Sequence, residues 1–351
     1  MSGRKLATIR KIVEIKDIEG ADRIQAYRVD GWWVVGQKDQ YKLDELVIYC
    51  EIDSWIPTEI APFLSKCKEP REFNGIKGER LKTIKLKGQL SQGLLLPLSV
   101  LIFGNEEDPF WDEGDDVSEH LNVTKWELSE KEFVRIYRQN KDARPGGFPY
   151  YIPKSDQERI QNYKTKTLQE LKDKEIIFEV TEKLEGSSLT AYINGEDEGV
   201  CSRNINLKEP EDDGFNAFWH VARKYKLLEK LRVLDRPLAI QGELVGPGIC
   251  GNIYKLDEYR FYLYNIWDIT AQRWLYPDER NELCDLLEIE QVPFDCNFII
   301  AQEDTVDDLL DMADGYSVIN KNVRREGLVY KSYSSTHSFK TVSNKYLLEK
   351  K

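Results

Sequence analysis

The chain has 351 residues, a net charge of −12, 41% hydrophobic residues and 32% charged residues; this length favours two domains, and this composition favours a soluble protein. No run approaches roughly 18 apolar residues and no apolar run follows the basic start, so we expect no membrane partner, no secretory signal and a cytoplasmic location. The acidic balance argues mildly against a nucleic-acid binder.

Residues 1 to 104 read as short strands. The apolar segments are ATIRKIVEI, RIQAYRVDGWWVVGQ, ELVIYCEI, LKTIKLKG and GLLLPL, and turn signals such as Asp30-Gly31 and Asn74-Gly75 separate them. Five or so short strands without a strong amphipathic helix predict a small barrel of the OB type. Trp32 and Trp33 are expected in its core.

The segment 75–89 has a charge opposite to that of the whole chain. It carries Lys77, Arg80, Lys82, Lys85 and Lys87 against Glu79 alone. A basic run is more often a solvated hairpin face than a binding site. Because OB-like barrels bind single strands and backbones, these five residues are also candidates for RNA binding.

The junction between the two halves falls near residues 120–150. An acidic stretch precedes it, and a second basic run with Tyr137 lies within it (Arg135, Arg138, Lys141 and Arg144). We predict an RNA-binding domain over residues 1–125 and a second domain over residues 126–351, with the second basic run as a candidate part of the RNA path.

The second domain mixes helices and strands, which gives an α+β protein. Helices are predicted over 156–174, with Ser155 or Asp156 as the cap, and over 215–234, 277–290 and 305–314. Strands are predicted over 176–183, 188–193, 199–203, 237–245, 260–269, 327–332 and 337–343.

The small number of histidines and the spacing of the cysteines argue against a catalytic or metal site built from these residues. The chain has 3 histidines and 6 cysteines. The cysteines form no CxxC pair, so buried free thiols are the favoured interpretation. An enzyme of this composition should rest on lysine, carboxylates and a hard metal ion.

The segment EKLEGSS, 182–188, places Lys183 at the end of a predicted strand. Gly186 would let the backbone approach a ligand there. A lysine amine can attack the α-phosphate of ATP if neighbouring cations or a metal favour its deprotonated form. Alone, this pattern is weak, and a surface lysine in a turn would be the favoured interpretation.

Further polar residues follow in order, each at the edge of an apolar strand. They are Arg203, Glu243, Tyr264, Glu326 and Lys340. Paired into sheets, these strands would surround one cleft with cations for phosphates, carboxylates for ribose or metal, and an aromatic for a base. The alternatives are a salt-bridged surface network and, for the aromatic strand, ordinary core packing.

This ordered set, spanning Lys183 to Lys340, resembles the covalent nucleotidyltransferases: DNA ligases, RNA ligases and capping enzymes. The chain is most similar to RNA ligases of the Deinococcus and Naegleria type, and GWWVV, EIDSWIP, DQERIQN and SNKYLL carry the resemblance beyond the core motifs. Such ligases have an N-terminal OB-like β-barrel followed by a nucleotidyltransferase domain with antiparallel sheets and flanking helices.

The resemblance implies a role for each matching residue. It makes Lys183 the catalytic residue that forms lysyl–AMP, and Glu185 and Glu326 the metal ligands. It assigns nucleotide contacts to Glu182, Glu185, Gly186, Arg203, Glu243, Tyr264 and Lys340, with Glu243 on the ribose and Tyr264 on the adenine. The implied cofactors are ATP and Mg²⁺ or Mn²⁺.

Three positions depart from the family pattern. Glu185 stands where aspartate is frequent, and Asn265 follows Tyr264 where many members have aspartate. The last motif is often Lys-x-Lys, but here Ser338 precedes Lys340 and Val342 follows it. The role of a second lysine is then absent or taken by Lys331 or Lys345.

The implied function is ATP-dependent sealing of 3′-hydroxyl/5′-phosphate breaks in RNA. The expected substrate is a nicked duplex, with an RNA/DNA hybrid as an option, and the expected state is a monomer. Two alternatives stay open: a non-catalytic RNA-binding protein on a ligase-like fold, and a GTP-dependent capping guanylyltransferase. The barrel at the N-terminus favours the ligase.

Overall fold

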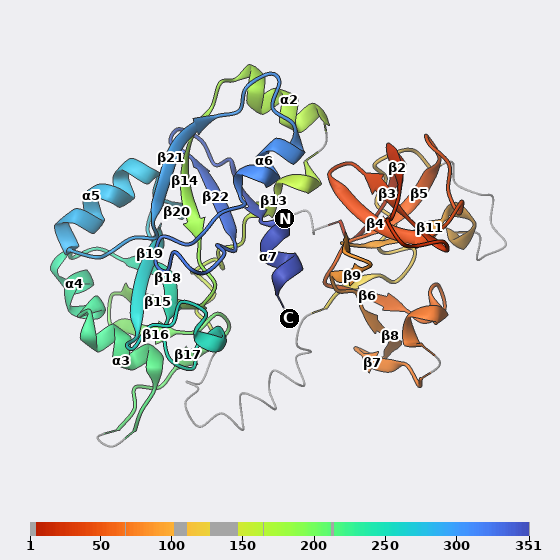
Figure 1. Cartoon of the computed structure of the whole chain (residues 1–351). Coiled ribbons are helices and arrows are strands. Elements are labelled where there is room, and N and C mark those ends of the chain that lie inside the picture. Colours follow the sequence, from red (N-terminus) through yellow and green to blue (C-terminus); the bar gives the residue numbers. More distant parts are fainter. Residues whose placement is uncertain are drawn as a thin grey trace. The chain divides into compact units, whose positions relative to one another are not determined.

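The computed structural model describes residues 5–66, 68–101, 111–126, 147–163, 165–211 and 214–350. The chain forms two compact units, shown in Figure 1. Unit 1 comprises Met1–Phe133 and Gln161–Lys166, and unit 2 comprises Val134–Ile160 and Thr167–Lys351. The expected boundary at 125/126 adjoins residues 127–146, which lie outside the described residues, as does the second basic run, so this boundary stays a prediction.

Unit 1 is built mainly from strands in four small antiparallel sheets. Their orders are β1-β5-β11, β2-β3-β4, β12-β6-β8-β7 and β10-β9. The strands are β1 Ala7–Lys11, β2 Glu14–Asp17, β3 Ile24–Val29, β4 Trp32–Gln37, β5 Leu46–Cys50, β6 Ser54–Pro57, β7 Arg71–Phe73, β8 Ile76–Arg80, β9 Ile84–Leu86, β10 Gln89–Ser91, β11 Leu94–Pro97 and β12 Thr124–Lys125. Two short 3₁₀ helices, η1 Pro62–Ser65 and η2 Leu98–Leu101, complete the described part.

Two tight turns in unit 1 follow directly from the sequence. Asp30 has φ of 47° between β3 and β4, and Asn74 and Gly75 have φ of 50° and 81° between β7 and β8. Asp-Gly and Asn-Gly tolerate positive φ, which the two-residue hairpin turn needs to match the twist of the strands. Trp32, which follows the first turn, is 2% exposed and belongs to the core as expected, whereas Trp33 is only partly buried.

Unit 2 contains two larger sheets with helices. One has the order β13-β23-β22-β14-β21 and the other β17-β16-β15-β18-β19-β20. The strands are β13 Glu158–Arg159, β14 Ile177–Lys183, β15 Ser187–Asn194, β16 Asp197–Cys201, β17 Asn206–Leu207, β18 Leu238–Val245, β19 Arg260–Asp268, β20 Arg273–Trp274, β21 Phe294–Ile299, β22 Gly327–Ser332 and β23 Ser338–Val342. The helices of unit 2 are α3 Ala217–Lys224, α4 Leu227–Val233, α5 Pro277–Leu287, α6 Val306–Met312 and α7 Asn344–Glu349, with the 3₁₀ turn η4 Cys250–Asn252. The 3₁₀ turn η3 Ile160–Asn162 and helix α2 Thr165–Asp173 each span a boundary between the two units.

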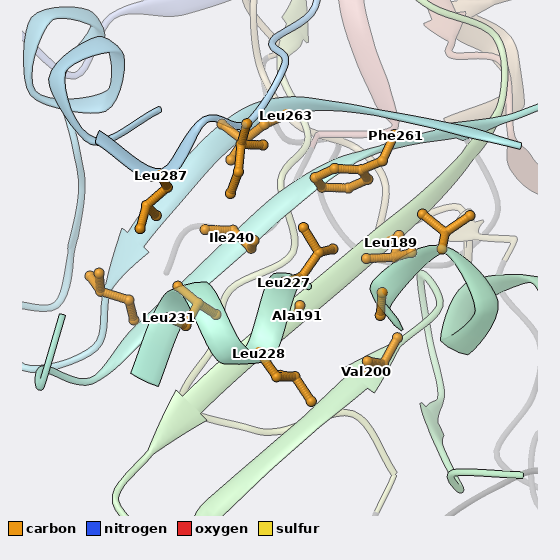
Figure 2. Close-up of a cluster of buried hydrophobic side chains, with 14 of the residues drawn as sticks. Leu189, Ala191, Val200, Leu227, Leu228, Leu231, Ile240, Phe261, Leu263 and Leu287 are labelled. Atoms are coloured by element: carbon orange, nitrogen blue, oxygen red, sulfur yellow. The ribbon is translucent and has the colours of Figure 1, made fainter. Parts of the chain in front are cut away.

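Apolar alternation along the strands builds the largest core of unit 2. Leu189 and Ala191 of β15 and Ile240 of β18 point to one face of their sheet, where Leu227 and Leu231 of α4 cover them (Figure 2). All five are at most 1% exposed. The opposite faces of β15 and β18 are thereby left to present Ser188 and Glu243, which are cross-strand partners.

Two helix predictions were wrong. The segment 156–174 is not one helix, because Glu158–Arg159 pairs in parallel with Phe339–Lys340 of β23 and only Thr165–Asp173 is α-helical. The segment 215–234 forms two helices, since Lys226 adopts φ of 52° between them. In both places tertiary contacts override the local helix propensity.

The strand predictions in unit 2 agree closely with the structure. β14, β18, β19 and β22 lie within one residue of the predicted bounds. β21, an edge strand beside β14, was not predicted, because its exposed positions include Phe294 and Ile299 and give no clean alternation. None of the described helices has the length and apolar character that a membrane crossing requires.

Candidate active site

A cavity of about 340 Å³ in unit 2 collects polar residues from well-separated segments of the chain. All nine residues predicted for catalysis, nucleotide binding or metal binding line it: Glu182, Lys183, Glu185, Gly186, Arg203, Glu243, Tyr264, Glu326 and Lys340. The cavity therefore brings together the groups that nucleotidyl transfer needs, although the individual roles remain predictions.

Lys183 is the last residue of β14, and its side chain meets a carboxylate from the neighbouring strand. Lys183 pairs in register with Gly327 of β22, so Glu326 arrives next to it, with Nζ and Oε2 2.7 Å apart. Position 327 requires glycine, because a Cβ there would lie 2.0 Å from the Thr341 carbonyl oxygen. Both side chains are about one-fifth exposed (25% and 18%), so the amine can meet a ligand.

Gly186 lies where the chain passes from β14 to β15 close to β18. A Cβ at this position would lie 2.5 Å from the Leu244 carbonyl oxygen and 2.9 Å from Cγ of Glu243. The glycine thus lets the Lys183 segment approach the strand that carries Glu243.

Glu243 is a buried carboxylate. Burial raises its pKa to about 7; the negative charge of Glu326 raises it further, while Lys183, Arg203 and the Gly186 backbone act in the opposite direction. Arg203, which is exposed, thus lies within electrostatic range of Glu243. A carboxyl that titrates near neutral pH in a cavity is typical of a functional group.

Tyr264 lies at a bulge of β19, since Leu263 pairs with Gly242 and Asn265 with Gln241. Its hydroxyl is 2.8 Å from Ser188 Oγ, and burial raises its pKa. Tyr262, on the same strand, is 3% exposed within a hydrophobic cluster and does not line the cavity. The geometry therefore favours Tyr264 as the aromatic that faces a ligand.

Lys331 also lines the cavity and is partly buried. Its Nζ donates to the Tyr264 carbonyl oxygen. Burial lowers its pKa to about 7, helped by the positive charge of Arg280 and opposed by Glu179. Lys345, the other candidate for the second lysine role, instead pairs with Asp314 at 3.1 Å and is not among the residues that line the cavity.

Lys340 meets a carboxylate that the sequence did not single out. Its Nζ is 2.7 Å from Oδ1 of Asp156, a residue expected only as a possible helix cap. The parallel pairing of Arg159 with Lys340 brings the two together. Burial lowers the pKa of Lys340 although Asp156 opposes this, and Lys183 is near enough to repel it.

Glu185 is held from two sides. Its backbone N–H donates to the Tyr254 hydroxyl at 2.8 Å, and its Oε1 is 2.6 Å from Nζ of Lys350. Glu182 has a different environment: its Oε2 accepts the Val318 N–H at 2.8 Å, and burial raises its pKa. No contact between its side chain and a nucleotide follows from this geometry, so that role stays a prediction.

The carboxylates of the cavity suit a hard divalent cation. Among the described residues, no three His, Cys, Asp or Glu side chains gather into a metal-binding group. Mg²⁺ commonly uses one or two carboxylates together with phosphates and water rather than an all-protein cage. Glu185 and Glu326, which line one cavity together with Lys183, Arg203 and Lys340, fit that arrangement.

The basic run of unit 1 is divided between two sheets. Lys77 and Arg80 are on β8, whereas Lys85 is on β9 of another sheet. Arg80 pairs with Asp53 at 2.5 Å and stacks 4.0 Å from the Trp126 ring centre. Lys82, Lys85 and Lys87 are exposed, so RNA binding by this run stays a prediction.

Sequence reasoning missed several cavity residues. Asp156, Ser188 and Cys250 line it although the sequence analysis gave none of them a role in the site. Cys250 also corrects the expectation of buried thiols, because it is exposed and its Sγ is 3.0 Å from the Gly186 carbonyl oxygen. The glycines around it in GPGICGN were the one signal that could have marked this loop.

Comparisons with known proteins agree with this geometry. A family model described as RNA ligase matches residues 176–347, and one described as an OB-fold domain matches residues 6–98. The comparison with curated proteins gives no match. The predicted fold class, an OB-like domain followed by a ligase-type α+β domain, is confirmed.

Solved structures of a Naegleria gruberi RNA ligase match nearly the whole chain. A lysine-to-alanine variant with ATP and Mn is 40% identical, covers 99% of both chains and has a TM-score of 0.80. A lysine-to-methionine variant with AMP and Mn is 41% identical over 99% of both chains, with a TM-score of 0.81. The ligase with PPi is 40% identical over 98% of both chains, with a TM-score of 0.78.

Proposed function

We propose that this chain, which belongs to the RNA ligase family, seals 3′-hydroxyl/5′-phosphate breaks in nicked RNA duplexes and works as a monomer through a lysyl–AMP formed on Lys183. The coarser function, an ATP-dependent RNA ligase, rests on that membership and on the N. gruberi structures with ATP, AMP and Mn. One observation carries the finer proposal: Lys183, Glu243, Glu326 and Lys340, far apart in sequence, line a single cavity.

In the first step, Nζ of Lys183 attacks the α-phosphorus of ATP. A nitrogen–phosphorus bond forms, the bond to the β-phosphate oxygen breaks, and pyrophosphate leaves. The amine must lose its proton before it can attack. Glu326, 2.7 Å from Nζ, orients the amine.

The other cavity residues take the roles that their chemistry supports. Glu243 would accept hydrogen bonds from the ribose hydroxyls, and Tyr264 would stack on the adenine. Lys340 and Arg203 would hold phosphate oxygens, as Lys340 already holds the carboxylate of Asp156. Cationic side chains that are already positioned beside a phosphate stabilise the charge that develops during transfer.

Glu185 and Glu326 would hold Mg²⁺ or Mn²⁺, which neutralises phosphate charge when bound. Glu185 lies two residues after Lys183, and Glu326 lies just before the neighbouring strand β22, with its Oε2 2.7 Å from the Lys183 amine. These positions in one cavity support the proposed metal site beside a phosphate attached to that amine.

Two further transfers complete the reaction. A 5′-phosphate oxygen of the RNA attacks the phosphorus of lysyl–AMP, which frees Lys183 and gives an adenylated RNA end. The 3′-hydroxyl then attacks the 5′-phosphate, the new phosphodiester forms, and AMP leaves. The five basic residues at 77–87 would contact the RNA backbone in these steps.

The first test is covalent labelling with α-³²P-ATP in the presence of Mg²⁺ or Mn²⁺. The wild type should carry label on a denaturing gel, and Lys183→Ala should carry none. Lys174→Ala, which replaces an exposed lysine just after α2, should match the wild type. Labelled GTP tests the capping alternative. An unlabelled wild type whose intact mass also lacks AMP would contradict the role of Lys183.

The second test addresses the break itself. Lys183→Ala should still seal RNA that is already adenylated, because the lysine is not the nucleophile of the last step. The wild type should seal a nick in a duplex faster than it joins two single strands. Equal rates on both substrates would refute the nicked-duplex proposal, and sedimentation of the active species tests the monomer.

A further inference from the structure

The segment Gly315–Arg325 forms an ordered hairpin between α6 and β22. Tyr316 and Arg324 form a bridge, the Ser317 N–H donates to the Val323 carbonyl at 2.8 Å, and the Arg325 N–H donates to the Gly315 carbonyl at 3.1 Å. The Arg325 side chain fixes the base by donating to the carbonyls of Met312 and Ala313. The hairpin thus holds its shape without a ligand.

This hairpin is bonded to both sides of Lys183. The Val318 N–H donates to Glu182, the residue before the lysine, at 2.8 Å. Nδ2 of Asn320 donates to the carbonyl of Tyr254, whose hydroxyl accepts the N–H of Glu185. Its position relative to the cavity is therefore fixed through two independent contacts.

The outer surface of the hairpin combines apolar and cationic side chains. Tyr316 is 55% exposed and Val318 is 61% exposed. The Arg324 guanidinium lies 4.6 Å from the centre of the Tyr316 ring, and the tip carries the exposed Lys321. Exposed aromatic and cationic groups side by side suit stacking on bases and contact with phosphates.

The surface continues onto α7. Arg324 pairs with Glu349 of α7 at 3.1 Å, and the next residue, Lys350, reaches Glu185 in the cavity. Lys345 of α7 is exposed beside Asp314 at the hairpin base. From residue 316 to residue 350 the chain carries seven Lys or Arg against two Asp or Glu, although the whole chain has 50 against 62.

From these observations the geometry points to an RNA-docking surface made of Tyr316, Val318, Lys321, Arg324 and Lys345. It binds the RNA strand next to the break: Lys321 and Lys345 meet its phosphates, and Tyr316 and Val318 meet a base or ribose. The inference rests on the proposed function of the cavity and adds a second contact region to the basic run of unit 1.

The experiment separates RNA docking from the first chemical step. Lys321→Glu and Tyr316→Ala are assayed for lysyl–AMP formation, which needs no RNA, and for sealing of a nicked RNA duplex over a range of substrate and salt concentrations. Lys174→Glu makes the same charge change at an exposed position just after α2, and Tyr316→Phe keeps the aromatic ring.

Lysyl–AMP formation should stay within about twofold of the wild type for every variant. The KM for the duplex should rise at least about fivefold in Tyr316→Ala, the lower end of what one stacked base contributes. It should rise similarly in Lys321→Glu, whose salt dependence should also fall by about one unit of slope. Tyr316→Phe and Lys174→Glu should keep the wild-type KM.

A wild-type KM and salt slope in Lys321→Glu would overturn the inference, as would slower lysyl–AMP formation with an unchanged KM, which would assign the hairpin to the nucleotide step. If Tyr316→Ala does not fold, Lys321→Glu, which changes an exposed residue at the tip of the hairpin, still tests the inference. Failure of the proposed function looks different, because then the wild type itself would not become labelled.

Discussion

Replacing Glu243 by glutamine should stabilise the protein above neutral pH while it slows adenylation. Burial raises the pKa of Glu243 from 4.5 to about 7, so the folded state binds this proton more tightly than the unfolded state does. The stability that the protonated form provides is complete below pH 4.5. It is lost as the pH rises through about 7.

The size of the effect follows from the shift. Because one pKa unit corresponds to about 1.36 kcal/mol, ionised Glu243 costs roughly 3 kcal/mol of unfolding free energy at high pH. Glutamine has the same shape and can still accept the Gly186 N–H, but it carries no charge. The stability difference between Glu243→Gln and the wild type should therefore grow by about 2–3 kcal/mol from pH 5 to pH 8.

Urea unfolding at the two pH values measures this difference. Comparing each variant with the wild type removes the contributions that the other titrating groups make to the free energy of unfolding. Glu282→Gln provides the matched control, because Glu282 is exposed on α5 and its replacement should give the same small difference at both pH values. Equal differences for Glu243→Gln at pH 5 and pH 8 would refute the reasoning.

Three other substitutions test different parts of the structure. Arg280→Met should destabilise by about 3–5 kcal/mol in urea unfolding, because it leaves Glu179 buried without its partner; a loss below about 1 kcal/mol would contradict this. Gly186→Ala should lower both the stability of the protein and the rate of labelling with ATP, since the Cβ would lie 2.5 Å from the Leu244 carbonyl oxygen. Unchanged labelling would show that the strand carrying Leu244 can shift to accommodate the methyl group. Lys350→Gln should lower the metal concentration needed for adenylation, measured by titrating Mn²⁺.

Local patterns were enough to find the strands next to Lys183 and Glu326. The apolar run before Lys183 and the one after Glu326 became β14 and β22 with nearly the predicted bounds. Their antiparallel pairing then sets the Lys183–Glu326 contact, because Lys183 and Gly327 are partners in the ladder. Such elements are predictable because their signals lie within a few residues.

Contacts that depend on distant parts of the chain were not predictable. Asp156 reaches Lys340 through the two-residue strand β13, which is too short to have a periodic signal and pairs with a segment about 180 residues later. The segment was helix-like by composition, but its pairing with β23 contributes backbone hydrogen bonds that a helix would remove. The left-handed turn at Lys226 likewise arises because α3 and α4 must both cover one sheet.

The contact between Lys350 and Glu185 also joins distant parts of the chain, and it should affect metal binding. Glu185 is a proposed metal ligand, and the Lys350 ammonium lies 2.6 Å from its Oε1. An ammonium and a divalent cation compete for one carboxylate, so removing the ammonium should reduce the Mn²⁺ concentration at half-maximal labelling by severalfold. Lys350→Arg keeps the charge and should behave as the wild type, and Lys174→Gln, at the position just after α2, controls for the loss of an exposed lysine. A higher metal requirement in Lys350→Gln would mean that Lys350 assists the metal, by holding Glu185 in position, rather than competing with it.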